Sequence, residues 1–132
     1  MNLVDSCGWL EYLAAGPNAD FFAVPLQEVD SLLVPSICIL DVFKRVLQQR
    51  GEDAALQVAA LMQQGQVVDL DTATALQSAR ISHDHHLPLA DSVILATARR
   101  FAATLWTQDG DFAGLEGVRY AEKHSATRGK IE

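Results

Sequence analysis

The chain has 132 residues and a mass of 14.4 kDa; 49% of its residues are hydrophobic and 20% are charged, and 17 acidic against 10 basic side chains give a formal net charge of -7. A chain of this size and composition can bury one core, which excludes an intrinsically disordered protein and a small scaffold held together by disulfides or a structural metal. It contains no apolar run near the ~20 residues of a membrane-spanning helix and no basic residue before Lys44, so we expect a cytoplasmic protein without a membrane segment or signal peptide.

The first half of the chain alternates short apolar segments with helical patterns. Trp9, Leu10 and Leu13 recur at helical spacing, and Gly51 and Gly65 are typical helix stops. The predicted elements are a strand at 2–5, a helix at 8–15, a helix that begins after Asn18, a strand at 31–35, a helix at 36–50 with Ser36 as its N-cap, and a helix at 52–64.

The second half continues the alternation. The predicted elements are a strand at 66–70, a helix from its N-cap Asp71 to about His83, a loop or frayed end at 83–86, a helix at 89–101, a strand at 104–107, a turn region at 108–117 and a fifth strand at 118–120. Short apolar strands separated by helices indicate an α/β fold of three layers, in which a short parallel central sheet is flanked by helices on both faces. We expect one domain at residues 1–122 and a polar tail at 123–132.

Charge is distributed unevenly along the sequence. Residues 1–43 contain six acidic side chains and no basic one, whereas residues 44–132 contain 11 acidic and 10 basic side chains. A surface of this kind repels nucleic acid, because nonspecific affinity for phosphates comes from Lys and Arg. A polyanionic partner would therefore require local neutralisation of carboxylates, for which a divalent metal ion is the natural candidate.

Acidic side chains end or follow three of the predicted strands, the first, the third and the fourth. Asp5 ends the first strand and Asp109 follows the fourth, while Asp91 lies in the first turn of the helix that leads to the fourth strand. Because ligands of parallel α/β proteins collect at the carboxyl ends of the strands, we expect these acids to converge. Clustered carboxylates repel one another unless a cation lies between them, and hard oxygen ligands suit Mg²⁺ or Mn²⁺, the ions of phosphodiester hydrolysis.

Each acid also has a structural interpretation. Asp5 is a possible N-cap, Asp91 complements a helix dipole, and Asp109 with Gly110 forms an ordinary turn. Asp41, inside the predicted helix at 36–50, is placed to pair with Arg45 at i,i+4. Two further acids at the end of the third strand, Asp69 and Asp71, are interpreted as structural.

Several motifs in order along nearly the whole chain resemble one known family. They are Val4-Asp5-Ser6, Val34-Pro35-Ser36 leading to Asp41, Leu89-Ala90-Asp91-Ser92-Val93-Ile94-Leu95-Ala96-Thr97-Ala98, and Trp106-Thr107-Gln108-Asp109-Gly110-Asp111-Phe112. Together they resemble the PIN-domain ribonucleases, most closely the VapC-type toxins of type II toxin–antitoxin systems. The segment around Asp91 and the Thr-x-Asp-x-Asp-Phe turn are the most specific parts.

The resemblance implies an Mg²⁺- or Mn²⁺-dependent endoribonuclease that acts as a toxin. It implies four catalytic acids, which are Asp5, Asp41, Asp91 and Asp109. All of these except Asp41 are implied to be metal ligands, and Asp111 is implied to be a further outer metal ligand. Ser6 and Thr107 are implied to support the site. It further implies an RNA substrate, a homodimer, and a cognate antitoxin whose C-terminal segment wraps the toxin. The family usually has Glu where this chain has Asp41, whose carboxylate is one methylene shorter.

Arginines, histidines and cysteines are the other candidate functional residues of the sequence. Arg45 and Arg99 are the predicted RNA contacts, whereas the histidines at 83–86 lack helical zinc spacing and are interpreted as a polar loop. The two cysteines, Cys7 and Cys38, lie in apolar stretches that are typical of buried reduced thiols. Two alternatives stay open: a catalytically weakened PIN-like module that binds RNA or protein, and a phosphoacceptor receiver domain that would use Asp69.

Overall fold

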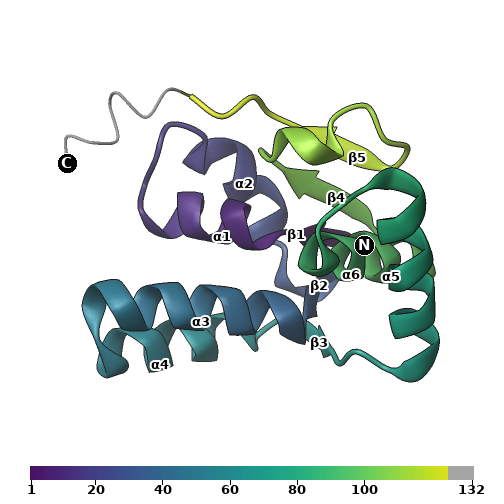
Figure 1. Ribbon diagram of the computed structural model, residues 1–132. Helices are drawn as coiled ribbons and strands as arrows, with labels where there is room; N and C mark the ends of the chain where they lie inside the picture. Colours follow the sequence, from purple (N-terminus) through teal and green to yellow (C-terminus); the bar gives the residue numbers. More distant parts are fainter. Residues whose placement is uncertain (125–132) are drawn as a thin grey trace.

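A computed structural model describes residues 1–124 of the chain, in which five strands form one parallel sheet (Figure 1). The strands are β1 (Asn2–Val4), β2 (Leu32–Pro35), β3 (Gln66–Val68), β4 (Thr104–Thr107) and β5 (Val118–Tyr120). Their order across the sheet is β3-β2-β1-β4-β5, and every neighbouring pair is parallel. Residues 125–132, and with them most of the predicted polar tail at 123–132, lie outside the described residues.

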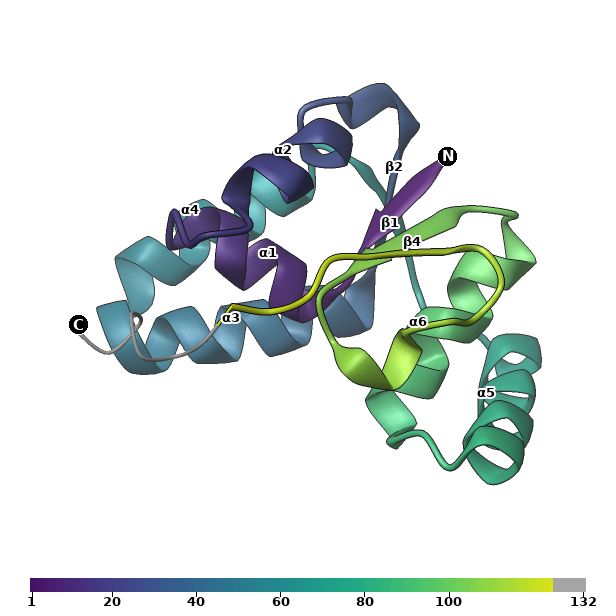
Figure 2. The same ribbon diagram turned by 90° about the horizontal axis from the view of Figure 1, so that it is seen from above.

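Helices cover both faces of the sheet, which confirms the predicted three-layer α/β architecture. They are α1 (Ser6–Leu13), α2 (Ala19–Leu26), α3 (Ser36–Arg50), α4 (Glu52–Met62), α5 (Thr72–His85) and α6 (Leu89–Arg100), with short 3₁₀ helices η1 (Val29–Ser31) and η2 (Gly110–Phe112). Helices α1 to α4 lie on one side of the sheet, and α5 and α6 on the other (Figure 2). None of the helices within residues 1–124 has both the length and the apolar character that a bilayer crossing requires.

The three central strands are apolar on both faces because helices cover both. Leu3, Leu33 and Leu105, on β1, β2 and β4, are fully buried, whereas the edge strands β3 and β5 are largely exposed. This burial explains why the central strands are continuous apolar runs without polar alternation.

Close packing between α1 and α2 seats the start of α1 against the sheet. A Cβ atom built on Gly8 would lie 2.6 Å from Cε1 of Phe22 and 2.6 Å from Cγ1 of Val4. Phe22 is fully buried and stacks edge-on against Phe21, at a ring-centroid distance of 5.0 Å. Only glycine allows this approach, so Gly8 fixes the distance between α1 and the residues beneath it.

Several predicted boundaries differ from the structure; the helix predicted at 8–15, for example, spans Ser6–Leu13. The strand predicted at 66–70 ends at Val68, because Val68 pairs with Pro35, the last residue of β2, and the ladder has no further partner. Ser36 is the first helical residue of α3, and its predicted role as N-cap is wrong, since the strand runs directly into the helix through Pro35. Helix α5 continues through His85 and ends at His86, which adopts a left-handed conformation with φ 57°.

The predicted cap of α5 is confirmed. An oxygen of Asp71 accepts a hydrogen bond of 2.9 Å from the backbone N–H of Thr74, and its other oxygen pairs with Arg100. The Arg100 guanidinium and this backbone donor lower the pKa of Asp71 to about 2. Asp71 is therefore structural, as the sequence indicates.

The sheet order places a topological switch point beside β1. From β1 the chain moves outward through β2 to β3, and it then crosses back to β4 on the other side of β1. Crevices at the carboxyl ends of such neighbouring strands are the usual ligand sites of open α/β sheets. The residues that follow β1 and β4 are Asp5 and the segment Gln108–Asp109.

Candidate metal centre and active site

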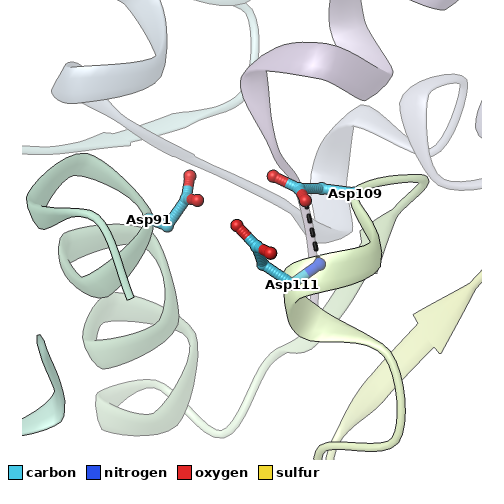
Figure 3. A group of neighbouring side chains, drawn as sticks. All are labelled: Asp91, Asp109 and Asp111. Atoms are coloured by element: carbon cyan, nitrogen blue, oxygen red, sulfur yellow. Dashed lines mark hydrogen bonds between the residues drawn. The ribbon is translucent and has the colours of Figure 1, made fainter. Parts of the chain in front are cut away.

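Three carboxylates meet where α6 begins and β4 ends. Ligand oxygens of Asp91, Asp109 and Asp111 lie within 4.8 Å of one another, and no other group of three such residues within 1–124 has this geometry. Figure 3 shows the three side chains directed toward a common space, one from α6 and two from the η2 turn. Asp91 and Asp109 are half-buried and Asp111 is exposed, so the cluster is open to solvent on one side.

Local backbone structure fixes the two acids of the η2 turn. Asp109 is the N-cap of η2, and its Oδ1 accepts a hydrogen bond of 2.9 Å from the backbone N–H of Asp111 (Figure 3). The remaining oxygens of the two carboxylates are free of intramolecular hydrogen bonds in the described structure. The Thr-x-Asp-x-Asp sequence thus makes a turn that presents two carboxylates on one side.

Asp5 is 3% exposed and lies near enough to Asp91 and Asp109 for the negative charges to repel one another. As N-cap of α1 it accepts a hydrogen bond of 2.9 Å from the N–H of Gly8, and its other oxygen accepts one of 2.5 Å from the hydroxyl of Thr107. The thiol of Cys7 lies 3.1 Å from the same carboxylate. Burial raises the pKa of Asp5, and the donors from Thr107, Cys7 and Gly8 oppose this rise. Asp5 therefore fulfils the structural role of a cap while it also faces the acid cluster.

Thr107 joins Asp5 to the η2 turn. Its hydroxyl donates to Asp5 and accepts a hydrogen bond of 2.9 Å from the backbone N–H of Asp109. Thr107 is fully buried and its bond to Asp5 is shielded from water, whereas its bond with Asp109 is partly buried. The placement of Asp109 is consequently coupled to that of Asp5 through a single side chain.

Asp41 reaches the site from α3. The hydroxyl of Ser6 donates a hydrogen bond of 3.0 Å to its Oδ2, and this bond joins α3 to the first residue of α1. The ion pairs among residues 1–124 are Arg100 with Asp71 and His83 with Asp84, so the i,i+4 pair of Asp41 with Arg45 does not form. Ser6 thus supports Asp41 directly, although the two residues are 35 positions apart.

Repulsion among the acids appears in the protonation of Asp91. Partial burial, followed by the negative charges of Asp109, Asp5, Asp111 and Asp41, raises the pKa of Asp91 to about 6. Removing this repulsion requires a proton or a cation in the same space. The donor set consists of carboxylate oxygens alone, which fits Mg²⁺ or Mn²⁺ better than Zn²⁺ or Cu²⁺.

Comparison with known families identifies the fold. The family model described as the PIN domain matches residues 3–118. The chain belongs to the PIN domain family. The match covers every acid of the site and ends at the first residue of β5.

Several solved structures are similar to this PIN domain. A toxin–antitoxin complex from Klebsiella pneumoniae gives a TM-score of 0.76 at 21% identity, covering 93% of this chain and 100% of that chain. Mycobacterium tuberculosis VapC20, described as a sarcin-ricin loop cleaving toxin, gives 0.71 at 17% identity, covering 90% and 99%. DNA-bound VapBC from Salmonella typhimurium gives 0.69 at 15%, covering 92% and 98%. At these identities the likeness establishes the shared fold. A search of curated protein sequences finds no significant match.

The PIN domain brings most of the predicted site residues together but separates the two predicted RNA contacts. Arg45 lies on α3, one turn beyond Asp41, and lines a groove beside the site. Arg99 lies eight residues beyond Asp91, ~12 Å further along α6, and lines a different depression with Arg100. Asp69, which the receiver-domain alternative needs, is an exposed residue after edge strand β3, and membership of the PIN family replaces that alternative.

A polar network beside the site is not predicted from the sequence. Asn18 Nδ2 donates hydrogen bonds of 2.9 Å to Oε1 of Gln108 and 3.0 Å to the carbonyl of Glu122, and its backbone N–H donates one of 2.7 Å to Glu11. Asn18 and Gln108 are both buried. The network fixes the residue before Asp109 and ties down the segment after β5, but its members lie up to 104 positions apart and have no local sequence signal.

Replacement of Thr107 by valine should lower metal affinity and any metal-dependent activity by roughly 10–100-fold, the usual cost of losing a side chain that orients a ligand. Valine keeps the shape of threonine but removes the hydroxyl that joins Asp5 to the N–H of Asp109. Isothermal titration with Mn²⁺ measures the affinity, and Thr104→Val, in the same strand but outside these contacts, is the control. Equal affinities for the two variants would contradict the orienting role of Thr107.

Proposed function

We propose that this PIN domain is an Mg²⁺- or Mn²⁺-dependent endoribonuclease, and that it acts as the toxin of a toxin–antitoxin pair. The convergence of Asp91, Asp109 and Asp111 at the switch point of the sheet carries the proposal. Membership of the PIN family and the likeness to VapC20 and to the VapBC complexes support it. The reaction is hydrolysis of an RNA phosphodiester bond.

Five acidic side chains have distinct roles in this proposal. Asp91, Asp109 and Asp111 hold the metal, and Asp5 completes the set from below while it anchors α1. A bound metal supplies positive charge for the phosphate and lowers the pKa of a water molecule. Asp41, held by Ser6, is the carboxylate that orients this water from the α3 side.

Partners and location follow from the same proposal. One similar structure is described as a toxin–antitoxin complex and VapC20 is described as a toxin, which supports a cognate antitoxin for this chain as well. We also propose that the protein forms a homodimer and works in the cytoplasm. Size-exclusion chromatography with light scattering measures the oligomeric state directly.

Cleavage of RNA by the purified protein tests the proposal. A pool of tRNA and rRNA fragments is incubated with Mg²⁺ or Mn²⁺, beside samples that contain EDTA or the Asp5→Asn variant. Discrete products that require both the metal and Asp5 are expected. Metal binding without cleavage across a full transcriptome of RNA would instead support the weakened, noncatalytic PIN-like module.

A further inference from the structure

A groove of about 610 Å³ runs along α3 and reaches Asp41. Its inner end is lined by Ser6, Asp41 and Gln108, the residues that hold or precede the acids of the site. One wall is α1, the other is α3, and the segment after β5 contributes Lys123. The groove is therefore continuous with the site and is built from three parts of the chain.

Basic side chains collect in this groove although the protein is acidic. Of the 10 lysines and arginines in the chain, Lys44, Arg45 and Lys123 line it, beside two acids, Asp41 and Glu11. All three are exposed, and none forms an ion pair within residues 1–124. Their positive charge is thus available to an anion, and it lies directly outward from Asp41.

The α3 wall has a regular chemical order. Asp41, the pair Lys44 and Arg45, and the pair Gln48 and Gln49 follow one another at helical spacing, so they occupy one face of α3. From Asp41 to Gln48 this face extends ~10 Å, about three phosphates at the ~3.4 Å rise of a stacked strand. Glutamine amides both donate and accept hydrogen bonds, which suits base edges beyond the phosphates.

The segment after β5 is held in place so that it closes the outer wall. The N–H of Ala121 donates a hydrogen bond of 3.0 Å to the carbonyl of Thr107, and Asn18 binds the carbonyl of Glu122. This segment returns toward α1 and α3 after the edge strand (Figure 2). Lys123 consequently faces the groove from a tethered backbone.

We propose that this groove binds the single-stranded flank of the RNA next to the cleaved bond, with Lys44, Arg45 and Lys123 on successive phosphates and Gln48 and Gln49 on bases. The inference rests on the proposed ribonuclease function and adds to it the path and direction of the substrate. A single strand suits the glutamines better than duplex RNA does, because only unpaired bases offer their Watson–Crick edges to a helix face. Arg99, on the far end of α6, takes no part.

Binding of RNA to cleavage-deficient protein tests the path. Lys44→Gln, Arg45→Gln and Lys123→Gln are each made in an Asp91→Asn background, and Arg80→Gln, exposed on α5, is the matched control. Fluorescence anisotropy with a short random-sequence single-stranded RNA is measured over a range of KCl concentrations. Each groove variant should weaken binding by up to about fivefold and flatten the salt slope by about 0.7, whereas the control should change neither.

Steady-state cleavage separates failure of the groove from failure of the ribonuclease. In protein with Asp91 intact, the groove variants should raise KM and leave kcat within about twofold, since uniform binding energy is lost. If the unaltered protein cleaves RNA but the groove variants match Arg80→Gln in affinity, salt slope and KM, the groove inference is overturned and the proposed function stands. Such a result would favour a protein partner in the groove. Absence of cleavage by the unaltered protein would overturn the proposed function itself.

Discussion

Replacement of Asp91 by asparagine should abolish RNA cleavage and, in the absence of metal, should stabilise the protein. The loss of rate is expected to be roughly a thousandfold or more, because metal ions supply several kcal/mol of charge stabilisation to phosphoryl transfer. The gain in stability follows from the cluster itself, in which Asp91 faces the charges of Asp109, Asp5 and Asp111. Asparagine keeps the size of the side chain and removes the repulsion.

The raised pKa of Asp91 determines how the change in stability caused by Asp91→Asn depends on pH. Because burial and neighbouring charge raise the pKa of Asp91 from 3.8 to about 6, the folded protein binds this proton more tightly than the unfolded chain. Stability therefore falls as pH rises from about 4 to about 6, and the loss persists at neutral pH. Metal-free Asp91→Asn should melt a few degrees above the unaltered protein at pH 7 and lose this advantage below pH 4.

Thermal melting in EDTA and in Mn²⁺ measures both effects without an activity assay. Mn²⁺ should raise the melting temperature of the unaltered protein, since a ligand that binds only the folded state stabilises it, and should leave Asp91→Asn nearly unchanged. Asp84→Asn, an exposed acid near the end of α5, is the matched control. A metal-free Asp91→Asn variant that melts below the unaltered protein at pH 7 would contradict the repulsion.

Truncation of Phe22 to alanine should cost ~3–5 kcal/mol of unfolding free energy, the usual range for a fully buried phenylalanine. Its ring fills the space between α2 and α1, against Phe21 and over Gly8. Since a domain of this size is stable by about 5–15 kcal/mol, this single change removes a large share of the total. Urea denaturation followed by circular dichroism measures the loss.

Gly8→Ala should also destabilise the protein, but by overpacking rather than by loss of packing. The expected cost is about 1–3 kcal/mol of unfolding free energy, because the new Cβ atom would meet Phe22 and Val4 at 2.6 Å. The double variant Gly8→Ala/Phe22→Ala should lose less than the sum, since the new methyl group occupies part of the space that the ring leaves. Val24→Ala, exposed on α2, should change stability by less than about 0.5 kcal/mol. Strict additivity would show that Gly8 and Phe22 are not in contact.

Local patterns predict the fold well where one residue decides a local structure. Asp71 caps α5 as expected, and the apolar runs at β1, β2 and β4 indicate buried parallel strands. The errors have a common origin in tertiary pairing. Val68 ends β3 because its partner strand ends, and Ser36 is no cap because Pro35 joins strand to helix without an intervening residue. Neither fact is encoded within the segment itself.

Part of the candidate site can likewise be predicted from the sequence, and the rest depends on tertiary packing. The sequence predicts that Asp5, Asp91 and Asp109 converge, because each lies beside the carboxyl end of a strand of one sheet. It cannot predict that Asp111 joins Asp91 and Asp109 more closely than Asp5 does, since this depends on the η2 turn and on the burial of Asp5. The contact of Ser6 with Asp41 likewise depends on how α1 packs against α3.

The strand order has a consequence for the stage of synthesis at which the acid cluster can assemble. Strand β1 pairs with β4, so Asn2 can pair only after Thr104, 102 residues later, has been synthesised. Asp91, Asp109 and Asp111 all belong to the last third of the chain. Contacts this distant in sequence form late, and domains emerge from the ribosome from the N-terminus onward. A nascent or prematurely ended chain therefore holds no assembled acid cluster, and any activity that depends on this cluster appears only when synthesis of the chain is nearly finished.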